Sequence, residues 1–138
     1  MPPERFWDLI DRAEALLFVT VGAEGFPRAR PMILVLRDGT TLWFATSAAS
    51  RKVGEIRANP HVTVLALDRG GFNHASLSGR AEVVGDPEAR ARLWREVWRE
   101  EWPAGAADPD YLLVRVVAER GAYSFSDTNE TSEFTLSG

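Results

Sequence analysis

The hydrophobic pattern divides the chain into one opening helix and a series of short strands. Apolar residues from Phe6 to Leu17 recur at helical spacing, which predicts an amphipathic helix over about residues 1–15. Runs rich in β-branched and aromatic residues then alternate with turn signals, and each run has the length of one strand. We expect strands at 17–21, 28–36, 41–46, 62–67 and 74–84, with the last strands at 111–117 and 122–125.

The turn signals between these runs indicate successive hairpins. The segment 23–27 has the composition of a hairpin turn, and Asp38-Gly39 is a strong tight-turn signal. Hairpins join antiparallel strands, whereas parallel strands need long crossovers. Gly79, inside the long run 74–84, is a candidate bulge or point of close backbone approach. The sequence therefore predicts a mainly β fold, a barrel of about six antiparallel strands with peripheral helices.

Two further helices are expected outside the barrel. The first begins after Ser50 and is ended by Asn59-Pro60, because the residue before a proline is driven out of helical geometry. The second begins at Asp86-Pro87-Glu88, which supplies a cap, a proline at the first position and an acid. We expect this second helix to run to about Trp102, where Pro103 ends it.

Three of the five tryptophans, Trp94, Trp98 and Trp102, fall four residues apart. On a helix this spacing produces a single aromatic stripe. Such a stripe is most often core or interface rather than a cofactor site. We expect it to be buried against the barrel or against a second subunit.

Composition limits the function classes. The 138 residues suffice for one domain with a hydrophobic core, and the net charge of −4, with arginines scattered among acids, argues against nucleic-acid binding. The sequence contains no cysteine, which excludes disulfides and thiolate metal ligands. It also contains no visible signal peptide and no apolar stretch long enough to span a membrane. We therefore predict a single cytoplasmic domain over 1–138 with no metal and no membrane or nucleic-acid partner. Its polar tail, 127–138, is expected to be partly disordered.

The most informative run is Thr46 to Lys52, which follows an expected strand and opens an expected helix. Ser50 is a favourable N-cap, and the next two residues are Arg51 and Lys52, the only lysine in the chain. Cations in a first helical turn oppose the helix dipole, and such a local conflict often marks a functional site. A bound anion would resolve it, held by backbone N–H groups, hydroxyls and two positive charges. The run predicts a phosphate site, and the alternative is an ordinary capped helix with a solvated face.

Several segments, in order, resemble the pyridoxamine 5'-phosphate oxidase-like flavoproteins. They are Arg30-Pro31-Met32, 42–47, Ser50-Arg51-Lys52 and Asn59-Pro60 before an apolar strand. The later segments 78–82, 102–105 and 108–110 are similar to the bacterial general-stress-protein branch of that family. The match runs from about residue 16 to residue 125. The resemblance implies a split β-barrel homodimer with two FMN molecules at the subunit interface.

The resemblance also implies roles for individual residues. Ser50, Arg51 and Lys52 would hold the FMN phosphate, helped by Thr46. The ring and ribityl chain would be lined by Phe44, Ala45, Thr46 and Ser47. The isoalloxazine would lie beside Arg30, Pro31 and Met32, with Arg30 near its polar edge. His74 would approach the flavin from the long strand, and the region of Trp102 would come from the partner subunit.

By the same resemblance, the protein would be an FMN-dependent oxidoreductase acting on a small organic molecule, with a link to stress. NAD(P)H is a candidate electron donor, and without a dinucleotide fingerprint its nicotinamide would have to stack directly on the FMN. True oxidases carry an Arg-and-His motif near the C-terminus that helps to bind pyridoxal, and 126–131 contains neither residue. This departure argues against vitamin B6 oxidation. No general acid or base is assigned; His74 is the candidate, and a structural role is the simpler interpretation.

Three alternatives stay open. The protein could hold FMN without catalysis, as a sensor or store. It could take a deazaflavin, whose longer anionic tail would need further cations such as Arg28 and Arg57. It could also be a structural dimer with an empty site, which would leave Arg51 and Lys52 unexplained.

Overall fold

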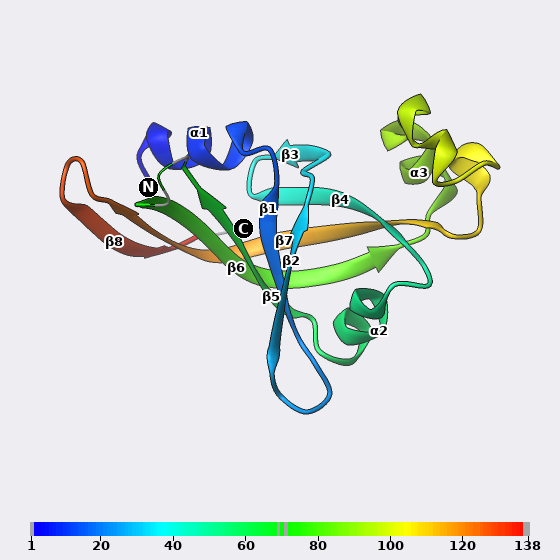
Figure 1. The fold of residues 1–138 in the computed structure, drawn as a ribbon, viewed down its shortest axis with the longest axis horizontal. Coiled ribbons are helices and arrows are strands. Elements are labelled where there is room, and N and C mark those ends of the chain that lie inside the picture. Colours follow the sequence, from blue (N-terminus) through cyan, green and yellow to red (C-terminus); the bar gives the residue numbers. More distant parts are fainter. Residues whose placement is uncertain (1, 69, 71, 137–138) are drawn as a thin grey trace.

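The computed structural model describes residues 2–68, 70 and 72–136, and within them eight antiparallel strands form one sheet (Figure 1). The sheet order is β2-β1-β5-β6-β7-β4-β3, and β8 pairs with β7 outside this path. The strands are β1 (Leu16–Val21), β2 (Pro27–Met32), β3 (Leu36–Asp38), β4 (Thr41–Ser47), β5 (His61–Leu67), β6 (Asn73–Val84), β7 (Tyr111–Phe125) and β8 (Glu130–Thr135). The helices are α1 (Glu4–Arg12), α2 (Arg51–Ala58), α3 (Pro87–Leu93) and two 3-10 turns, η1 (Glu96–Glu100) and η2 (Gly105–Ala107). The mainly β, antiparallel prediction is confirmed.

A short connection between β2 and β3 brings the two ends of the sheet together. β2 pairs with β1 at one end of the strand order, whereas β3 pairs with β4 at the other. The step from Met32 to Leu36 can span at most about 14 Å. The predicted single strand over 28–36 is therefore wrong, because the chain must leave one edge of the sheet and join the other within these residues. The result is the split barrel.

Side chains that alternate along the strands fill the barrel interior. β1 and β5 bury every second residue, as expected for strands with one face on a core. Phe18 of β1 and Phe44 of β4 meet edge to face at the centre, with their ring centroids 5.1 Å apart. α1 closes one end of the barrel with Phe6 and Ile10, which are fully buried.

The C-terminal part of the chain is more ordered than its composition predicts. The strands expected at 111–117 and 122–125 are one continuous strand, β7, whose polar middle keeps its pairing with β6 through a register shift between Ser78 and Gly79. This shift confirms the predicted bulge. The tail expected to be partly disordered contains β8, because Phe134 packs its ring on Phe6 at a centroid distance of 5.1 Å. Residues 137–138 of that tail lie outside the described residues.

The tryptophan stripe is built differently from the prediction. α3 ends at Leu93, and Trp94 has extended geometry, so the expected helix to Trp102 is broken before η1. The three tryptophans nevertheless meet, because all of them pack around Tyr111 with centroid distances of 5.1–5.9 Å. Trp102 is buried, and the tryptophan cluster covers the first residues of β7. The predicted burial of the tryptophans against the barrel is therefore confirmed. Tertiary packing here outweighs the local preference for a continuous helix.

Within the described residues, no helix is both long and apolar enough to cross a membrane.

Candidate functional site

Three polar side chains converge where β4 ends and α2 begins. The Lys52 ammonium donates a hydrogen bond to Thr46 Oγ1 over 2.8 Å. Thr46 Oγ1 also lies 3.2 Å from Ser50 Oγ, close enough for a hydrogen bond. One residue from the end of β4, one from the loop and one from the first turn of α2 thus form a single polar cluster, made of Thr46, Ser50 and Lys52.

Ser50 occupies the N-cap position of α2 but does not cap it. Its backbone is extended, as N-cap geometry requires, yet its hydroxyl makes no hydrogen bond to the helix N–H groups. The hydroxyl turns toward Thr46 instead. The expected capping hydrogen bond is therefore absent, and the N-terminus of α2 keeps N–H groups that a ligand can engage.

Lys52 is a half-buried cation without a carboxylate partner among the described residues. No Asp or Glu oxygen of those residues lies within 4.0 Å of its ammonium group. Burial, and to a smaller extent the positive charge of Arg30, lower the pKa of Lys52. A bound anion would supply the missing counter-charge and offset the cost of desolvating the ammonium group.

The cluster lies in the wall of a hollow of about 570 Å³, here called the Lys52 hollow. This volume falls within the roughly 300–1,000 Å³ typical of ligand pockets. Apolar side chains from the 31–35 connection and from η1 form the remaining wall. Ile33 and Val97 are 65% and 79% exposed at the hollow, unusual values for branched aliphatic side chains. The lining residues are Pro31, Met32, Ile33, Val35, Ala45, Thr46, Ser47, Ser50, Lys52, Arg95, Val97, Trp98, Glu101 and Trp102.

The loop between β4 and α2 is held by Asp110, at the start of β7. The backbone N–H of Ala49 donates to Asp110 Oδ1 over 3.1 Å, and the N–H of Ala48 donates to the Asp110 carbonyl oxygen over 2.7 Å. On the other side, the indole N–H of Trp102 donates to Asp110 Oδ2 over 3.3 Å. Hydrogen bonds from the Ser47 side chain and from the Ala49 N–H lower the pKa of Asp110.

Arg30 lies beneath α2 rather than in the wall of the Lys52 hollow. Its guanidinium donates to Thr20 Oγ1 over 2.8 Å and to Glu55 Oε1 over 3.1 Å. Glu55 also accepts a hydrogen bond from Thr20 and forms an ion pair with Arg28 at 2.8 Å. Burial acts to raise the pKa of Glu55, but the Thr20 hydrogen bond and the two arginines outweigh it, so the pKa is lowered.

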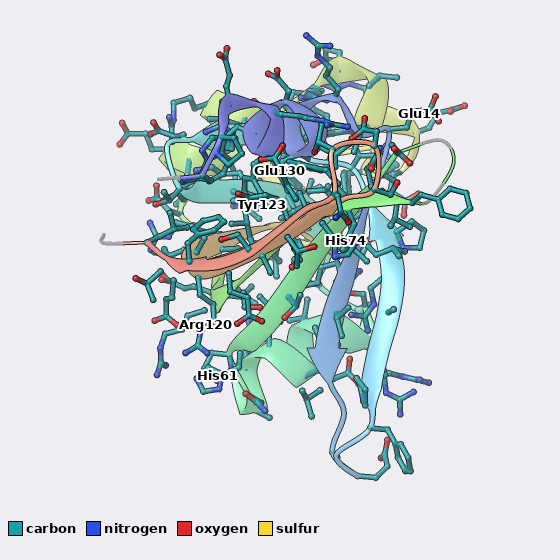
Figure 2. All side chains as sticks on the ribbon, turned by 90° about the vertical axis from the view of Figure 1, so that its left-hand side faces the viewer. Glu14, His61, His74, Arg120, Tyr123 and Glu130 are labelled. Atoms are coloured by element: carbon teal, nitrogen blue, oxygen red, sulfur yellow. The ribbon has the colours of Figure 1, made fainter. Side chains whose placement is uncertain are left out.

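Besides Arg30, three predicted site residues are not brought to the Lys52 hollow within one chain. Arg51 is exposed and lines a separate groove between α2 and the β1–β2 hairpin. Phe44 faces the barrel interior and is fully buried, because Ala45, its neighbour on the strand, takes the outward position. His74 lies at the start of β6, opposite Leu67 and Ser124. Figure 2 shows His74 on the side that forms the left-hand end of Figure 1, away from α2.

Trp102 lies at the site of its own chain, which the resemblance does not imply. The resemblance implies that its region comes from the partner subunit, yet Trp102 lines the Lys52 hollow of its own chain. The η1 turn and the packing on Tyr111 bring it there.

Sequence reasoning missed Arg95 and Trp98 as lining residues and Asp110 as the anchor of the loop. The Asp108-Pro109-Asp110 segment was noticed only as part of the resemblance. The available signal was a carboxylate directly before a strand. Only the pairing of β7 with β4, the strand that leads into the Thr46–Lys52 run, shows that this carboxylate lies beside the run.

Comparisons with known proteins identify the family and the fold. Residues 3–125 match the family model for pyridoxamine 5'-phosphate oxidase. General stress protein 26 of Bacillus subtilis is 29% identical over 119 residues, which cover 84% of this chain and 83% of that protein. Two solved structures share the fold. One is a protein of Clostridium acetobutylicum related to general stress protein 26, with a TM-score of 0.85, 24% identity and coverage of 98% and 97% of the two chains. The other is the general stress FMN/FAD binding protein of Xanthomonas citri, with a TM-score of 0.75, 27% identity and coverage of 98% and 92%.

Proposed function

This chain belongs to the pyridoxamine 5'-phosphate oxidase family, and on that premise we propose that it binds FMN in the Lys52 hollow and acts as an oxidoreductase on a small organic molecule. The observation that carries the proposal is the convergence of Lys52, Thr46 and Ser50 at the open N-terminus of α2. The general stress FMN/FAD binding protein of X. citri supports the cofactor class, and general stress protein 26 supports a role in stress.

The polar end of the hollow fits a phosphomonoester. A phosphate ester carries about −1.5 to −2 charges at neutral pH, which complements a lysine that has no carboxylate among its described neighbours. A hydrogen bond to a charged group contributes about 1.5–3 kcal/mol, roughly twice the contribution of a neutral one. Lys52, the hydroxyls of Thr46 and Ser50, and the uncapped N–H groups of α2 would together hold the phosphate.

The apolar wall fits an aromatic ring system. Met32 and Trp102 are buried at the hollow, and Pro31, Ala45 and Trp98 complete a surface with few polar atoms. A bound flavin supplies the chemistry, namely transfer of hydride or electrons. The protein residues would bind and orient the ring and keep water from part of its surface.

The surrounding charges favour FMN over a deazaflavin with a longer anionic tail. Arg28, a candidate for binding such a tail, is paired with both Glu24 and Glu55 at 2.6 and 2.8 Å. The groove that continues from it along α2 therefore presents carboxylates beside its arginines. A polyanionic tail would meet repulsion there.

We also propose that the protein acts as a homodimer, with the cofactor site at the subunit interface. Two rows of neighbouring side chains cross the outer face of β2, β1, β5 and β6 without a charge. One row is Ala29, Val19, Thr63 and Ser78; the other is Pro31, Leu17, Leu65 and Ser76. A solvent-facing antiparallel sheet normally carries polar and charged residues on its outer face. Because Pro31 also lines the Lys52 hollow, this face is continuous with the site, and a second copy seated on it would reach the cofactor.

The proposed substrate is not pyridoxamine phosphate. The segment 126–131 lacks the arginine and histidine of the true oxidases, and in the structure it forms the turn into β8 rather than a wall of the hollow. NAD(P)H stays the candidate electron donor, and the cytoplasm stays the expected location.

An absorbance spectrum of the purified protein, with mass identification of any released chromophore, tests the cofactor. We expect a flavin spectrum and release of FMN. A colourless protein that takes up a deazaflavin but not FMN would contradict the choice of cofactor. Tight FMN without turnover by any donor and acceptor pair would contradict catalysis and favour a sensor or store.

A further inference from the structure

Asp110 does not line the Lys52 hollow, yet it binds both of its walls. One carboxylate oxygen accepts the Ala49 N–H of the loop that leads into α2, and the other accepts the indole N–H of Trp102. Its backbone carbonyl holds Ala48 as well, so three hydrogen bonds at 2.7–3.3 Å connect this residue to the two sides. Asp110 therefore links the segment that carries Ser50 to the aromatic wall.

The position of Asp110 is itself fixed by its neighbours. Asp108 Oδ1 accepts the Asp110 N–H over 3.0 Å, and Asp108 Oδ2 accepts the Ala104 N–H over 3.1 Å. Tyr111, the next residue, is fully buried and donates its hydroxyl to the Arg90 carbonyl oxygen over 2.9 Å. The carboxylate is thus held on a braced turn between the tryptophan cluster and β7.

The contacts require a carboxylate rather than an amide. Three groups face the two oxygens: the Ser47 hydroxyl, the Ala49 N–H and the Trp102 indole N–H. The two N–H groups can only donate and lie on different oxygens, so each oxygen must accept. An asparagine offers one acceptor and one donor, and its NH₂ group would point at an N–H on one side or the other. A side chain of almost unchanged shape would therefore release either the loop or the tryptophan.

We propose that Asp110 is the positioning residue that gives the site its preference for a phosphorylated flavin over the same flavin without phosphate. It holds Ala48 and Ala49 so that the Ser50 hydroxyl, the first N–H groups of α2 and Lys52 face one point. The inference rests on the proposed function. It adds that the phosphate contacts are strong because this loop is fixed in place before a ligand binds.

The test compares FMN with riboflavin, which has the same ring and ribityl chain but no phosphate. Flavin-free wild type, Asp110→Asn, Ser47→Ala and Trp102→Phe are titrated with each ligand while flavin fluorescence is followed. For Asp110→Asn we expect FMN affinity to fall by about 10-fold or more, the equivalent of one charge-assisted hydrogen bond, while riboflavin affinity changes by less than about 3-fold. Ser47→Ala should change the ratio in the same direction by a smaller factor.

Trp102→Phe is the matched control, since it removes the indole N–H and keeps an aromatic ring. We expect it to weaken both ligands similarly and to leave their ratio unchanged. Circular dichroism shows which variants fold, and Ser47→Ala, which leaves Asp110 in place, decides the question if Asp110→Asn does not fold.

Equal losses for both ligands in Asp110→Asn, or an unchanged ratio in Ser47→Ala, would overturn this inference and leave FMN binding standing. Wild-type protein that binds neither ligand would overturn the proposed function and this inference with it. The two failures are therefore distinguished by the wild-type titration alone.

Discussion

Lys52 brings a positive charge to a half-buried position, where the hydroxyls of Thr46 and Ser50 are its polar neighbours. Arg51, the next residue back in the sequence, projects from α2 into a different groove and is exposed. From the sequence, both cations are expected to hold the same phosphate. The structure separates them, because consecutive residues on a helix point about 100° apart.

Replacing each cation in turn tests this separation. We expect Lys52→Met to lower FMN affinity by about 30-fold or more, since it removes a charge-assisted hydrogen bond and the counter-charge for the phosphate. Arg51→Met, the matched control, should lower affinity by less than about 3-fold through longer-range attraction. Equilibrium titration of the flavin-free proteins measures both. Equal losses in the two variants would show that Arg51 turns into the site when ligand binds.

Phe44 and Ala45 show which assignments of residues to the cofactor site can be made from the sequence alone. The resemblance places both beside the flavin, but a strand sends consecutive side chains to opposite faces. Only one of the two can face the Lys52 hollow, and the larger side chain fills the barrel against Phe18. Thr46, Ser50 and Lys52 meet because the strand end and the helix start are adjacent in sequence, so a local pattern suffices to group them. Asp110 and Trp98 arrive through long-range packing that no local pattern records.

At the scale of elements, α2 is fixed to the barrel by one carboxylate. Glu55 accepts a hydrogen bond from Thr20 of β1 and forms ion pairs with Arg28 and Arg30 of β2. Its side chain is 9% exposed, so these contacts are only weakly screened by solvent. The anchor lies one turn after Lys52 on the same helix, and its carboxylate supplies the counter-charge of Arg30.

This anchor predicts a defined dependence of stability on pH. Because the folded-state pKa of Glu55 is lowered from the ordinary 4.5, its contribution is fully present above about pH 4.5 and is lost as pH falls through the lowered value. Glu55→Gln should therefore reduce the free energy of unfolding by about 2 kcal/mol at pH 7, since Arg30 loses its ion pair and Arg28 keeps only its exposed pair with Glu24. Urea unfolding at a series of pH values measures the difference, which should shrink below pH 4. A difference that is constant with pH would contradict the electrostatic origin.

The bulge in β6 brings two backbones so close together that its glycine should be essential for stability. A Cβ atom on Gly79 would overlap the carbonyl oxygen of Val117 and lie 2.9 Å from Ala118 Cα, so the two backbones approach too closely for any other residue. Gly79→Ala should destabilise the fold by about 3 kcal/mol or more, because backbone atoms cannot move aside as a side chain can. Gly54→Ala is the control, since a Cβ there meets no atom within 4 Å. Thermal melting of both variants checks the expectation, and equal melting temperatures would contradict it.

The fold class and most strand positions follow from period-two patterns and turn residues, which act over a few positions. What the sequence did not show is where tertiary contacts override local preference. Trp94 leaves its helix to pack on Tyr111, and the polar residues 130–133 join β8 because Phe134 reaches the core. In both places an aromatic contact between distant residues decides the backbone conformation.

At the scale of the whole molecule, the outer face of β2, β1, β5 and β6 is unusual because its central positions carry no charge. Its two uncharged rows run unbroken across the four strands. Leu65 lies near the middle of one row, between Leu17 and Ser76.

A charge at that position should prevent the proposed dimer. We expect wild-type protein to elute as a dimer in size-exclusion chromatography with light scattering, and Leu65→Arg to elute as a monomer with reduced FMN retention. An unpaired charge buried at an interface destabilises the complex by several kcal/mol, because it loses its water without gaining a partner. Leu36→Arg, on an exposed site of β3, is the control and should stay dimeric. A dimeric Leu65→Arg variant would place the interface elsewhere.

The contact between α1 and the β7–β8 hairpin also determines the order of folding. Arg5 forms two hydrogen bonds with Asp127 at 2.6 and 2.8 Å, across 122 positions of sequence, and Phe6 packs on Phe134. A ribosome therefore releases α1 long before it has made the surface on which this helix rests. Until then Phe6 lacks the ring of Phe134 and Arg5 lacks Asp127, so the first helix to be synthesised completes its packing only when nearly the whole chain has been made.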